Sequence, residues 1–138
     1  MSSQDDPRER VAIAVVEHQG RYLVGARRAN QPLAGLAEFP GGRRLPGEEG
    51  AACAVRECRE ETGLGVNVVR KLCECRHAYA HGTLELEFWL CRPAQDENPD
   101  RAGGGFRWVP AESLKSLEFP EANRTVLEIL AAGSQPAS

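Results

Sequence analysis

The sequence has no long apolar run, no apolar segment near its N-terminus and no excess of basic residues. Without a stretch of about 20 apolar residues we expect no membrane-spanning helix. The opening residues MSSQDDPRER lack the apolar core of a signal peptide, which predicts a cytoplasmic protein. A net charge of −3 offers no basic footprint for duplex nucleic acid, so a polyanionic partner has to be small or held through a metal ion.

What remains is the composition of a soluble globular protein, with 41% apolar and 27% charged residues. A chain of 138 residues forms one domain, large enough to bury a core, and we expect residues 10–132 to be its ordered part. The five cysteines are an odd number in a chain without a secretion signal, so we interpret them as reduced thiols that serve as small apolar side chains. The alternative, a metal or redox role for Cys73 and Cys75, lacks the second pair of ligands that a zinc site needs.

Apolar periodicity and turn residues predict a mixed sheet held between helices. A Pro, Gly and Ala-rich loop is expected over 30–42 and a polar loop over 92–105. Pro120 is expected at the first position of the last helix. The predicted strands are 11–16, 22–28, 66–80, 83–92 and 106–110, and the predicted helical segments are 48–62, 111–117 and 120–133.

Three glutamates lie close together in the predicted helix that ends at Gly63. Positions i, i+3 and i+4 share one helix face, so Glu57, Glu60 and Glu61 should form one acidic patch. Each like-charged pair costs about 0.2–0.5 kcal/mol, which an exposed helix face tolerates. The patch is therefore either a solvated acidic surface or a cation site.

The surrounding residues favour a cation site. Mg²⁺ and Mn²⁺ prefer several oxygen ligands, which converging carboxylates supply. Arg56 could orient the neighbouring carboxylate of Glu57 through a charge-assisted hydrogen bond. Upstream, Gly41 and Gly42 allow the backbone to approach a ligand closely.

Residues 42–64, GRRLPGEEGAACAVRECREETGL, resemble the Nudix box, and each fixed position of that motif is present. Cys58 stands where the family usually has Leu, Ile or Val, which keeps the position apolar. The flanking segments, YLVGARRANQPLAGLAEFPGG before the box and FRWVPAESLKSLEFPEANRTVLEIL after it, are similar to the MutT-like branch of the family. The resemblance implies a Nudix α/β/α sandwich and hydrolysis within a nucleoside diphosphate linkage. The matching positions are Gly42, Glu48, Arg56, Glu57, Glu60, Glu61 and Gly63.

The resemblance also implies roles for these residues. Glu57, Glu60 and Glu61 would bind metal with the Gly41 carbonyl, and Glu48 would support the loop and the start of the helix. The general base is less clear, because Ala102 occupies the position where relatives often carry an acidic residue. A box glutamate, Glu60 or Glu61, is the first candidate, and Asp100 or Glu97 is the alternative.

Substrate choice is expected to depend on residues outside the box. Asn123, in the FPEAN segment, resembles an Asn that hydrogen-bonds the purine edge in relatives, and its amide offers both a donor and an acceptor. The alternative is that Asn123 only occupies the first turn of a helix. Arg28 matches an arginine near the nucleotide. Phe39, Tyr79 and Leu86 could sandwich a base, or could be plain core residues.

We therefore expect a Mg²⁺-dependent nucleoside triphosphate pyrophosphohydrolase, with Mn²⁺ as a possible substitute, that acts as a monomer or a homodimer. The favoured substrate is an oxidised purine deoxynucleotide such as 8-oxo-dGTP, which would make the enzyme a sanitiser of the nucleotide pool in support of DNA repair. Pyrimidine triphosphates such as (d)CTP are the alternative substrates. A non-catalytic nucleotide-binding module is the alternative of another class, although such modules typically have an eroded box.

Overall fold

The computed structural model describes residues 9–31, 33–80 and 82–133, apart from the side chain of Tyr79. Within these residues no helix is both long and apolar enough to cross a membrane. The strands are β1 Glu9–His18, β2 Arg21–Ala26, β3 Ala37–Glu38, β4 Gly41–Arg43, β5 Val66–Tyr79, β6 Gly82–Pro93 and β7 Arg107–Pro110. The helices are α1 Gly50–Thr62 and α2 Arg124–Gly133, with 3-10 turns η2 Pro99–Arg101, η3 Ala111–Ser116 and η4 Glu121–Asn123.

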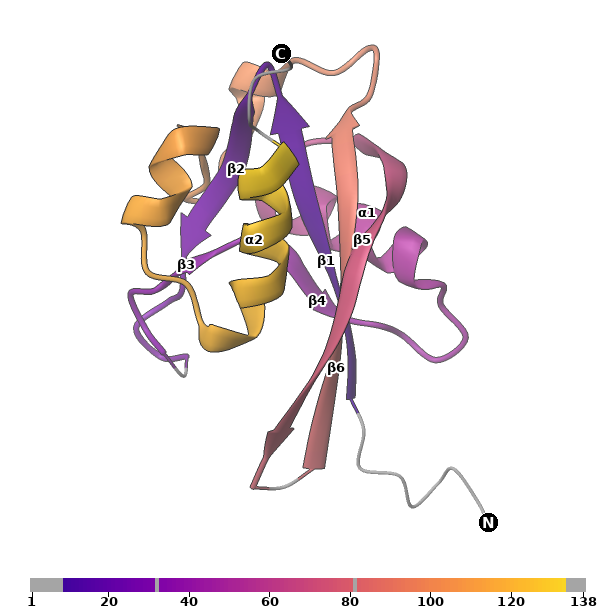
Figure 1. Cartoon of the computed structure of the whole chain (residues 1–138). Coiled ribbons are helices and arrows are strands. Elements are labelled where there is room, and N and C mark those ends of the chain that lie inside the picture. Colours follow the sequence, from indigo (N-terminus) through magenta and orange to yellow (C-terminus); the bar gives the residue numbers. More distant parts are fainter. Residues whose placement is uncertain (1–8, 32, 81, 134–138) are drawn as a thin grey trace.

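β1 lies at the centre of a mixed sheet with the strand order β3-β2-β1-β6-β5 (Figure 1). It pairs in parallel with β6 along one edge. Along its other edge it pairs antiparallel with β4 near its start and with β2 near its end. β5 and β6 form a long antiparallel hairpin that extends beyond the helices.

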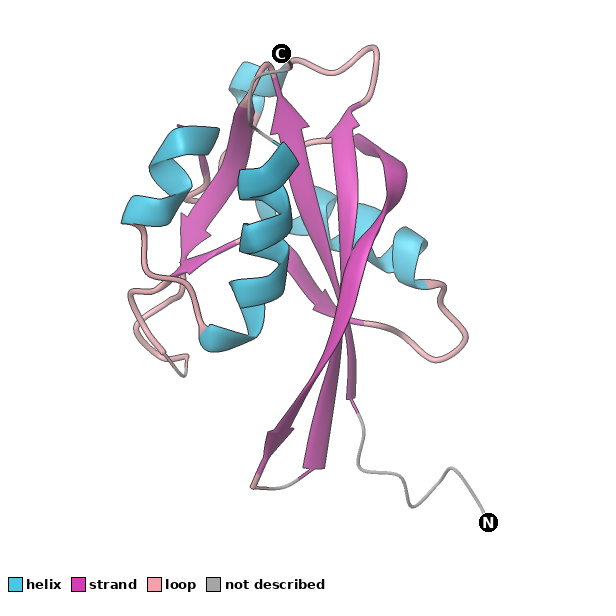
Figure 2. Ribbon diagram, in the orientation of Figure 1, coloured by secondary structure: helices cyan, strands magenta, loops and turns pink. Residues whose placement is uncertain are grey.

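The sheet is covered on both faces, by α1 on one and by α2 on the other (Figure 2). Alternate residues of β1 show why. Ile13 and Val15 pack into the core that contains α2, whereas Ala12 and Ala14 pack into the core that contains α1. Because a strand buried on both faces needs apolar residues at every position, the unbroken run VAIAVV suits this central place. The structure confirms the α/β/α sandwich expected from the sequence.

The predicted elements are present, but several boundaries differ. α1 begins at Gly50 rather than at residue 48, because Glu48 lies in a turn in which its N–H donates to the Leu45 carbonyl. Pro120 does not begin the last α-helix, since it precedes η4 and α2 starts only at Arg124. Residues 30–42 are not loop throughout, as they contain the short strands β3 and β4.

The thiols of Cys53, Cys58 and Cys91 are buried in the core beneath α1. Burial raises the pKa of Cys53 and Cys58 to about 11 and that of Cys91 to about 12. A thiol reacts through its thiolate, so these three are unreactive near neutral pH. Their burial fits the interpretation of small apolar side chains.

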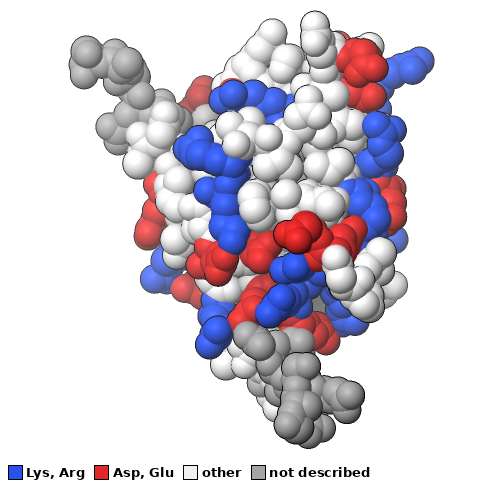
Figure 3. Space-filling view, turned by 90° about the vertical axis from the view of Figure 1, so that its right-hand side faces the viewer, with Lys and Arg blue, Asp and Glu red and all other residues white. Residues whose placement is uncertain are grey.

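Charged side chains of both signs are intermixed on the face shown in Figure 3, and neither sign forms a continuous patch there. The upper part of this face is largely uncharged. This distribution is in keeping with the near balance of 17 basic and 20 acidic residues.

Candidate active site

Gly41 and Gly42 lie on β4, directly beneath α1, and neither position has room for a side chain. A Cβ added to Gly42 would overlap the Glu57 carboxyl group. A Cβ on Gly41 would lie 2.7 Å from the Ala12 carbonyl oxygen. At Gly41 the obstacle is backbone, so only glycine lets β1 approach β4 this closely, whereas at Gly42 the obstacle is the end of the Glu57 side chain.

The backbone of Gly41 faces the helix. Ala14 N–H donates to the Pro40 carbonyl and Arg44 N–H donates to the Arg10 carbonyl, so hydrogen-bonded pairs between β1 and β4 fall on either side of Gly41. In an antiparallel ladder bonded and non-bonded pairs alternate, which turns the N–H and C=O of Gly41 away from β1. The N–H donates to Glu61 Oε1 at 3.3 Å. The carbonyl points to the same side and is a possible metal ligand.

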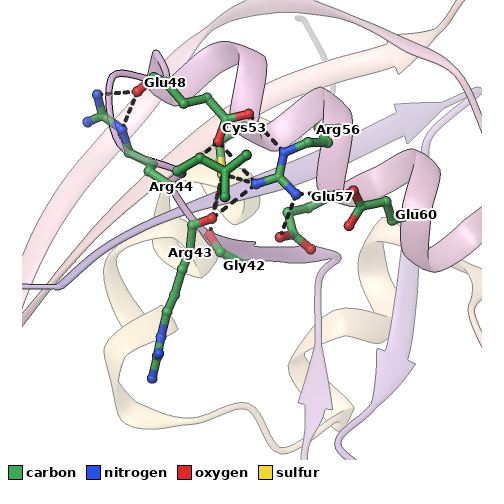
Figure 4. A network of polar contacts seen from close by, with 9 residues as sticks. Gly42, Arg43, Arg44, Glu48, Cys53, Arg56, Glu57 and Glu60 are labelled. Atoms are coloured by element: carbon green, nitrogen blue, oxygen red, sulfur yellow. Dashed lines mark hydrogen bonds and ion pairs between the residues drawn. The ribbon is translucent and has the colours of Figure 1, made fainter.

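Arg56 is the centre of a network that joins the box residues (Figure 4). Its Nε and Nη2 donate to both carboxylate oxygens of Glu48, at 2.8 and 3.0 Å. Its Nη1 donates to Glu57 at 3.2 Å and to Glu60 at 3.1 Å. A single guanidinium thus orients three carboxylates, a task that its planar set of five donors allows.

Glu48 is held from two sides. Besides Arg56, the backbone N–H of Leu45 donates to Glu48 Oε1 at 2.9 Å. The hydrogen bonds from Arg56 and Leu45 lower the pKa of Glu48 to about 2. Glu48 therefore stays ionised and is hydrogen-bonded to the loop before α1.

Glu57 and Glu61 form the acidic centre of the site. Only 16% of the Glu57 side chain is exposed, which is too little for a simple solvated helix face. Burial and a hydrogen bond with Glu57 raise the pKa of Glu61 well above its usual range, and the negative charge of Glu38 adds to the effect. Two carboxylates at such short range share a proton unless a cation lies between them.

The third glutamate lies further out. Glu60 is 57% exposed and its carboxylate accepts from Arg56. Across the described part of the chain, no three His, Cys, Asp or Glu side chains converge closely enough to hold a metal ion. The donor chemistry, carboxylates with a free carbonyl beside them, fits Mg²⁺ or Mn²⁺. Binding by all three glutamates, however, requires Glu60 to turn away from Arg56.

The alternative candidates for the general base lie elsewhere. Glu97 accepts from the Gly65 N–H at 2.9 Å and pairs with Arg59 at 3.7 Å, beyond the end of α1. Asp100 is exposed in η2. Glu61, in contrast, lines a cavity beside Gly41 and Gly42, and the loop that carries Ala102 reaches that cavity through Gly104 and Phe106. Glu97 and Asp100 are not among the residues that line this cavity.

A cavity of about 1120 Å³ opens beside Glu61. Gly41 and Gly42 form part of its wall at the end where the box carboxylates lie. The structure brings four of the five predicted substrate residues to the same cavity: Arg28, Phe39, Leu86 and Asn123. The fifth, Tyr79, has a side chain outside the described part of the structure.

These substrate candidates are ordered in different ways. Phe39 stacks on Phe119 with ring centroids 5.0 Å apart. Asn123 is 8% exposed and lies in η4, where its Nδ2 donates to the Pro120 carbonyl at 3.3 Å. Leu86 and Phe39 belong to the buried core as well as to the cavity wall, so the core role and the lining role coexist.

Sequence reasoning assigned no role to several residues that the structure places at the site. Glu38 lines the cavity next to Phe39, pairs with Arg27 at 3.4 Å, and has a pKa raised by burial. Phe119 forms the second ring of the aromatic pair. Glu38 is next to Phe39, and Phe119 is in the same segment as Asn123, but position in the sequence does not show whether a side chain points into the cavity.

Comparison with known proteins identifies the family. The family model described as NUDIX domain matches residues 11–129. The 8-oxo-dGTP diphosphatase of Escherichia coli K12 is 26% identical over 118 residues, which are 85% of this chain and 92% of that protein. The CTP pyrophosphohydrolase of the same bacterium is 33% identical over 79 residues, 57% of this chain and 58% of that protein.

The fold is shared with solved structures. The solution structure of the E. coli ORF135 protein superimposes with a TM-score of 0.76 over the whole of both chains, at 24% identity. The crystal structure of a MutT protein from Methanosarcina mazei Go1 gives a TM-score of 0.75 at 20% identity, over 96% of this chain and 99% of that one. Together with the filled box on β4 and α1, these matches show that the chain belongs to the Nudix family and is a hydrolase of its MutT-like branch.

Proposed function

We propose that this hydrolase converts nucleoside triphosphates to a monophosphate and pyrophosphate with Mg²⁺, and that an oxidised purine deoxynucleotide such as 8-oxo-dGTP is its preferred substrate. The observation that carries the proposal is the cavity. Its lining contains two sets of residues, which we call the first wall (Gly41, Gly42 and Glu61) and the second wall (Phe39, Phe119 and Asn123). A nucleotide with its phosphates at the first wall and its base at the second would contact both sets.

In this proposal Glu57, Glu60, Glu61 and the Gly41 carbonyl hold the metal. When bound, Mg²⁺ or Mn²⁺ would neutralise phosphate charge and make a water molecule a better nucleophile. Arg56 keeps the glutamates oriented through the hydrogen bonds described above. Positioning and charge supply most of what phosphoryl transfer needs from a protein.

We propose that a box glutamate is the general base, which accepts the proton of the attacking water. Glu61 is favoured over Glu60 because Glu61 lines the cavity. It is also less exposed than Glu60, which is largely exposed and bound to Arg56. Arg28 lines the same cavity and supplies a cation for the phosphates or the sugar edge.

Base recognition is assigned to the second wall. The Phe39 and Phe119 rings offer an aromatic surface, and Asn123 offers a donor and an acceptor for a purine edge. The match to the E. coli 8-oxo-dGTP diphosphatase over 92% of its length favours a purine. The higher identity to the CTP pyrophosphohydrolase, although over only 58% of that protein, keeps (d)CTP as the second candidate.

A panel of triphosphates tests the proposal. Pyrophosphate release should be measured with Mg²⁺ for 8-oxo-dGTP, dGTP, dATP, dCTP, CTP and 5-methyl-dCTP, and the nucleotide products should be measured for ADP-ribose and a dinucleoside polyphosphate. We expect the highest kcat/KM for 8-oxo-dGTP. If kcat/KM is highest for the cytosine nucleotides, (d)CTP becomes the preferred substrate in place of 8-oxo-dGTP. Cleavage of only ADP-ribose or dinucleoside polyphosphates would overturn the assignment of the second wall to base recognition.

The Glu60→Gln variant separates an enzyme from a binding module. A hydrolase should lose orders of magnitude in turnover and still bind nucleotide, measured by calorimetry. A pure binding module should show no metal-dependent turnover either before or after the substitution.

A further inference from the structure

Arg44 makes an unusual contact with the loop that precedes α1. Its Nε and Nη2 both donate to the backbone carbonyl of Glu48, at 2.9 and 2.6 Å. The side chain of the same Glu48 accepts two hydrogen bonds from Arg56. Glu48 is therefore held by one arginine at its backbone and by another at its carboxylate.

The third guanidinium nitrogen of Arg44, Nη1, contacts a residue of the sheet. Its Nη1 lies 3.3 Å from Glu87 Oε2, and both side chains are less than one fifth exposed. Glu87 Oε1 accepts from the indole N–H of Trp89 at 3.1 Å. Both oxygens of a carboxylate on β6, 43 residues away in sequence from Arg44, are thus engaged.

Glu87 also lies at the start of α1. A Cβ added to Gly50, the first residue of the helix, would overlap Glu87 Oε1. The N-cap residue Glu49 makes no capping hydrogen bond with its side chain. A carboxylate at this end of a helix complements the positive end of the helix dipole. Glu87 therefore connects the sheet to both the helix start and the loop.

We propose that Arg44 and Glu87, here called the Arg44–Glu87 clamp, are positioning residues for the hydrolysis reaction. The clamp holds the Glu48 backbone in place, Glu48 holds Arg56, and Arg56 orients Glu57 and Glu60. This inference rests on the proposed function for its kinetic consequences, and it adds two residues outside the fixed positions of the box.

The geometry requires an arginine at position 44. Two donors converge on one carbonyl while a third reaches a carboxylate on another element, and a lysine ammonium cannot span both. Because Glu48 Oε1 and Oε2 are already bound to Arg56, a shift of the Glu48 backbone has to move Arg56 or break these bonds. Loss of the clamp is therefore transmitted to the glutamates.

The first measurement needs neither metal nor substrate. In the metal-free protein, amide hydrogen exchange should be faster over residues 43–50 in Arg44→Met than in wild type, with the Leu45 N–H, which donates to Glu48 Oε1, as the reporter. Exchange in β5 and β6 should stay unchanged. Arg92→Met is the matched control, because Arg92, on β6, also donates to a carboxylate on another strand, Glu17 at 3.0 Å, but lies outside the site.

The second measurement is kinetic. Arg44→Met should lower kcat about 10- to 100-fold and raise the Mg²⁺ concentration for half-maximal activity, with little change in the KM for nucleotide. Arg44→Lys should recover only part of the loss. Glu87→Gln keeps the size of the side chain and an acceptor for Trp89, so it should fold and show a smaller loss in the same direction.

A double substitution tests whether the clamp acts through Glu48. In a Glu48→Gln background the carboxylate contacts to Arg56 are already weakened, so adding Arg44→Met should cost less than it does in wild type. Equal losses in both backgrounds, or a loss that only follows the fraction of unfolded protein, would overturn the positioning role. Unchanged exchange over 43–50 in both Arg44→Met and Glu87→Gln would overturn the clamp itself.

The two proposals fail in different ways. If the wild type releases no pyrophosphate from any triphosphate, the proposed function is wrong, and the exchange measurement still decides whether the clamp holds the loop. If the wild type is active and the clamp variants match Arg92→Met in both measurements, the clamp is wrong and the proposed function stands.

Discussion

Arg56 is the residue on which the geometry of the site depends most. It contacts Glu48, Glu57 and Glu60 and donates to the Arg43 carbonyl at 3.1 Å. The carboxylates of Glu48, Glu60 and Glu57 raise its own pKa, so it carries its charge at any accessible pH. One permanent cation thus keeps several carboxylates in place before a metal ion arrives.

The ion pair of Glu48 predicts a specific pH dependence of stability. The folded-state pKa of Glu48 is about 2, below its ordinary value of 4.5, so ionisation of this group favours the folded state. That contribution is fully present above about pH 4.5 and is lost as the pH falls towards 2. In Glu48→Gln the contribution is absent throughout.

Urea unfolding of wild type and Glu48→Gln between pH 7 and pH 2.5 measures this contribution. The difference in the free energy of unfolding between the two proteins should shrink as the pH falls through the window. Parallel curves with a constant difference would show that Glu48 is not held as described.

Asn123 carries a prediction about selectivity. If its amide pairs with a purine edge, Asn123→Ala should lower kcat/KM for the preferred purine about 5- to 150-fold, equivalent to about 1–3 kcal/mol. Values for pyrimidine triphosphates should change less. An equal loss for all bases would mean that Asn123 only supports η4, where it already bonds Pro120.

At the scale of elements, the close contact between β4 and α1 determines where the carboxylates lie. Gly42→Ala would force the Glu57 carboxyl to move, because the new methyl group overlaps it. We expect kcat to fall about 10- to 100-fold, since small displacements of positioning groups are costly to catalysis. The melting temperature should change little, because the displaced group is the end of a flexible side chain.

Gly103→Ala is the control for this prediction. The nearest atom to a Cβ at Gly103 is the Arg101 carbonyl oxygen at 3.9 Å, so the added methyl group makes only an ordinary van der Waals contact. Its kinetics should match wild type. Full activity in Gly42→Ala would contradict the assigned place of Glu57.

The elements also show what could be predicted from the sequence. Spacing predicted that Glu57, Glu60 and Glu61 share a face of a helix ending at Gly63, and the Gly63 N–H indeed bonds the Arg59 carbonyl at the end of α1. Spacing could not predict that Glu60 turns to Arg56 while Glu61 turns to Gly41. These choices depend on β4, which has no strand-like composition and forms because β1 and α1 enclose it.

The whole molecule explains the remaining differences. Along residues 83–88 apolar and polar side chains alternate, a pattern typical of a strand with one buried face and one polar face, and Glu87 belongs to the polar set. In the sandwich that face meets α1, so Glu87 contacts Arg44 and Trp89 instead of solvent. Contacts between residues more than 40 positions apart leave no local signal, which is why neither Arg44 nor Glu87 stood out in the sequence.

The same arrangement builds the cavity. Its wall combines β1, β4, β6 and the loop before β3 with η4 near the C-terminus, and α1 adds Glu61. The resemblance to MutT-like enzymes singled out Arg28, Phe39, Leu86 and Asn123, which are far apart in sequence and line one cavity. Their common position supports a role in substrate binding.

The central claim is that the enzyme cleaves a triphosphate into monophosphate and pyrophosphate, and that this cleavage depends on the box carboxylates. Products from the preferred triphosphate should be quantified with Mg²⁺, with a chelator, and with the Glu61→Gln variant after its fold and nucleotide binding have been verified. The account predicts equal amounts of monophosphate and pyrophosphate, no orthophosphate, and a loss of orders of magnitude in the chelated and Glu61→Gln samples. Formation of diphosphate and orthophosphate, or turnover that survives both treatments, would contradict it.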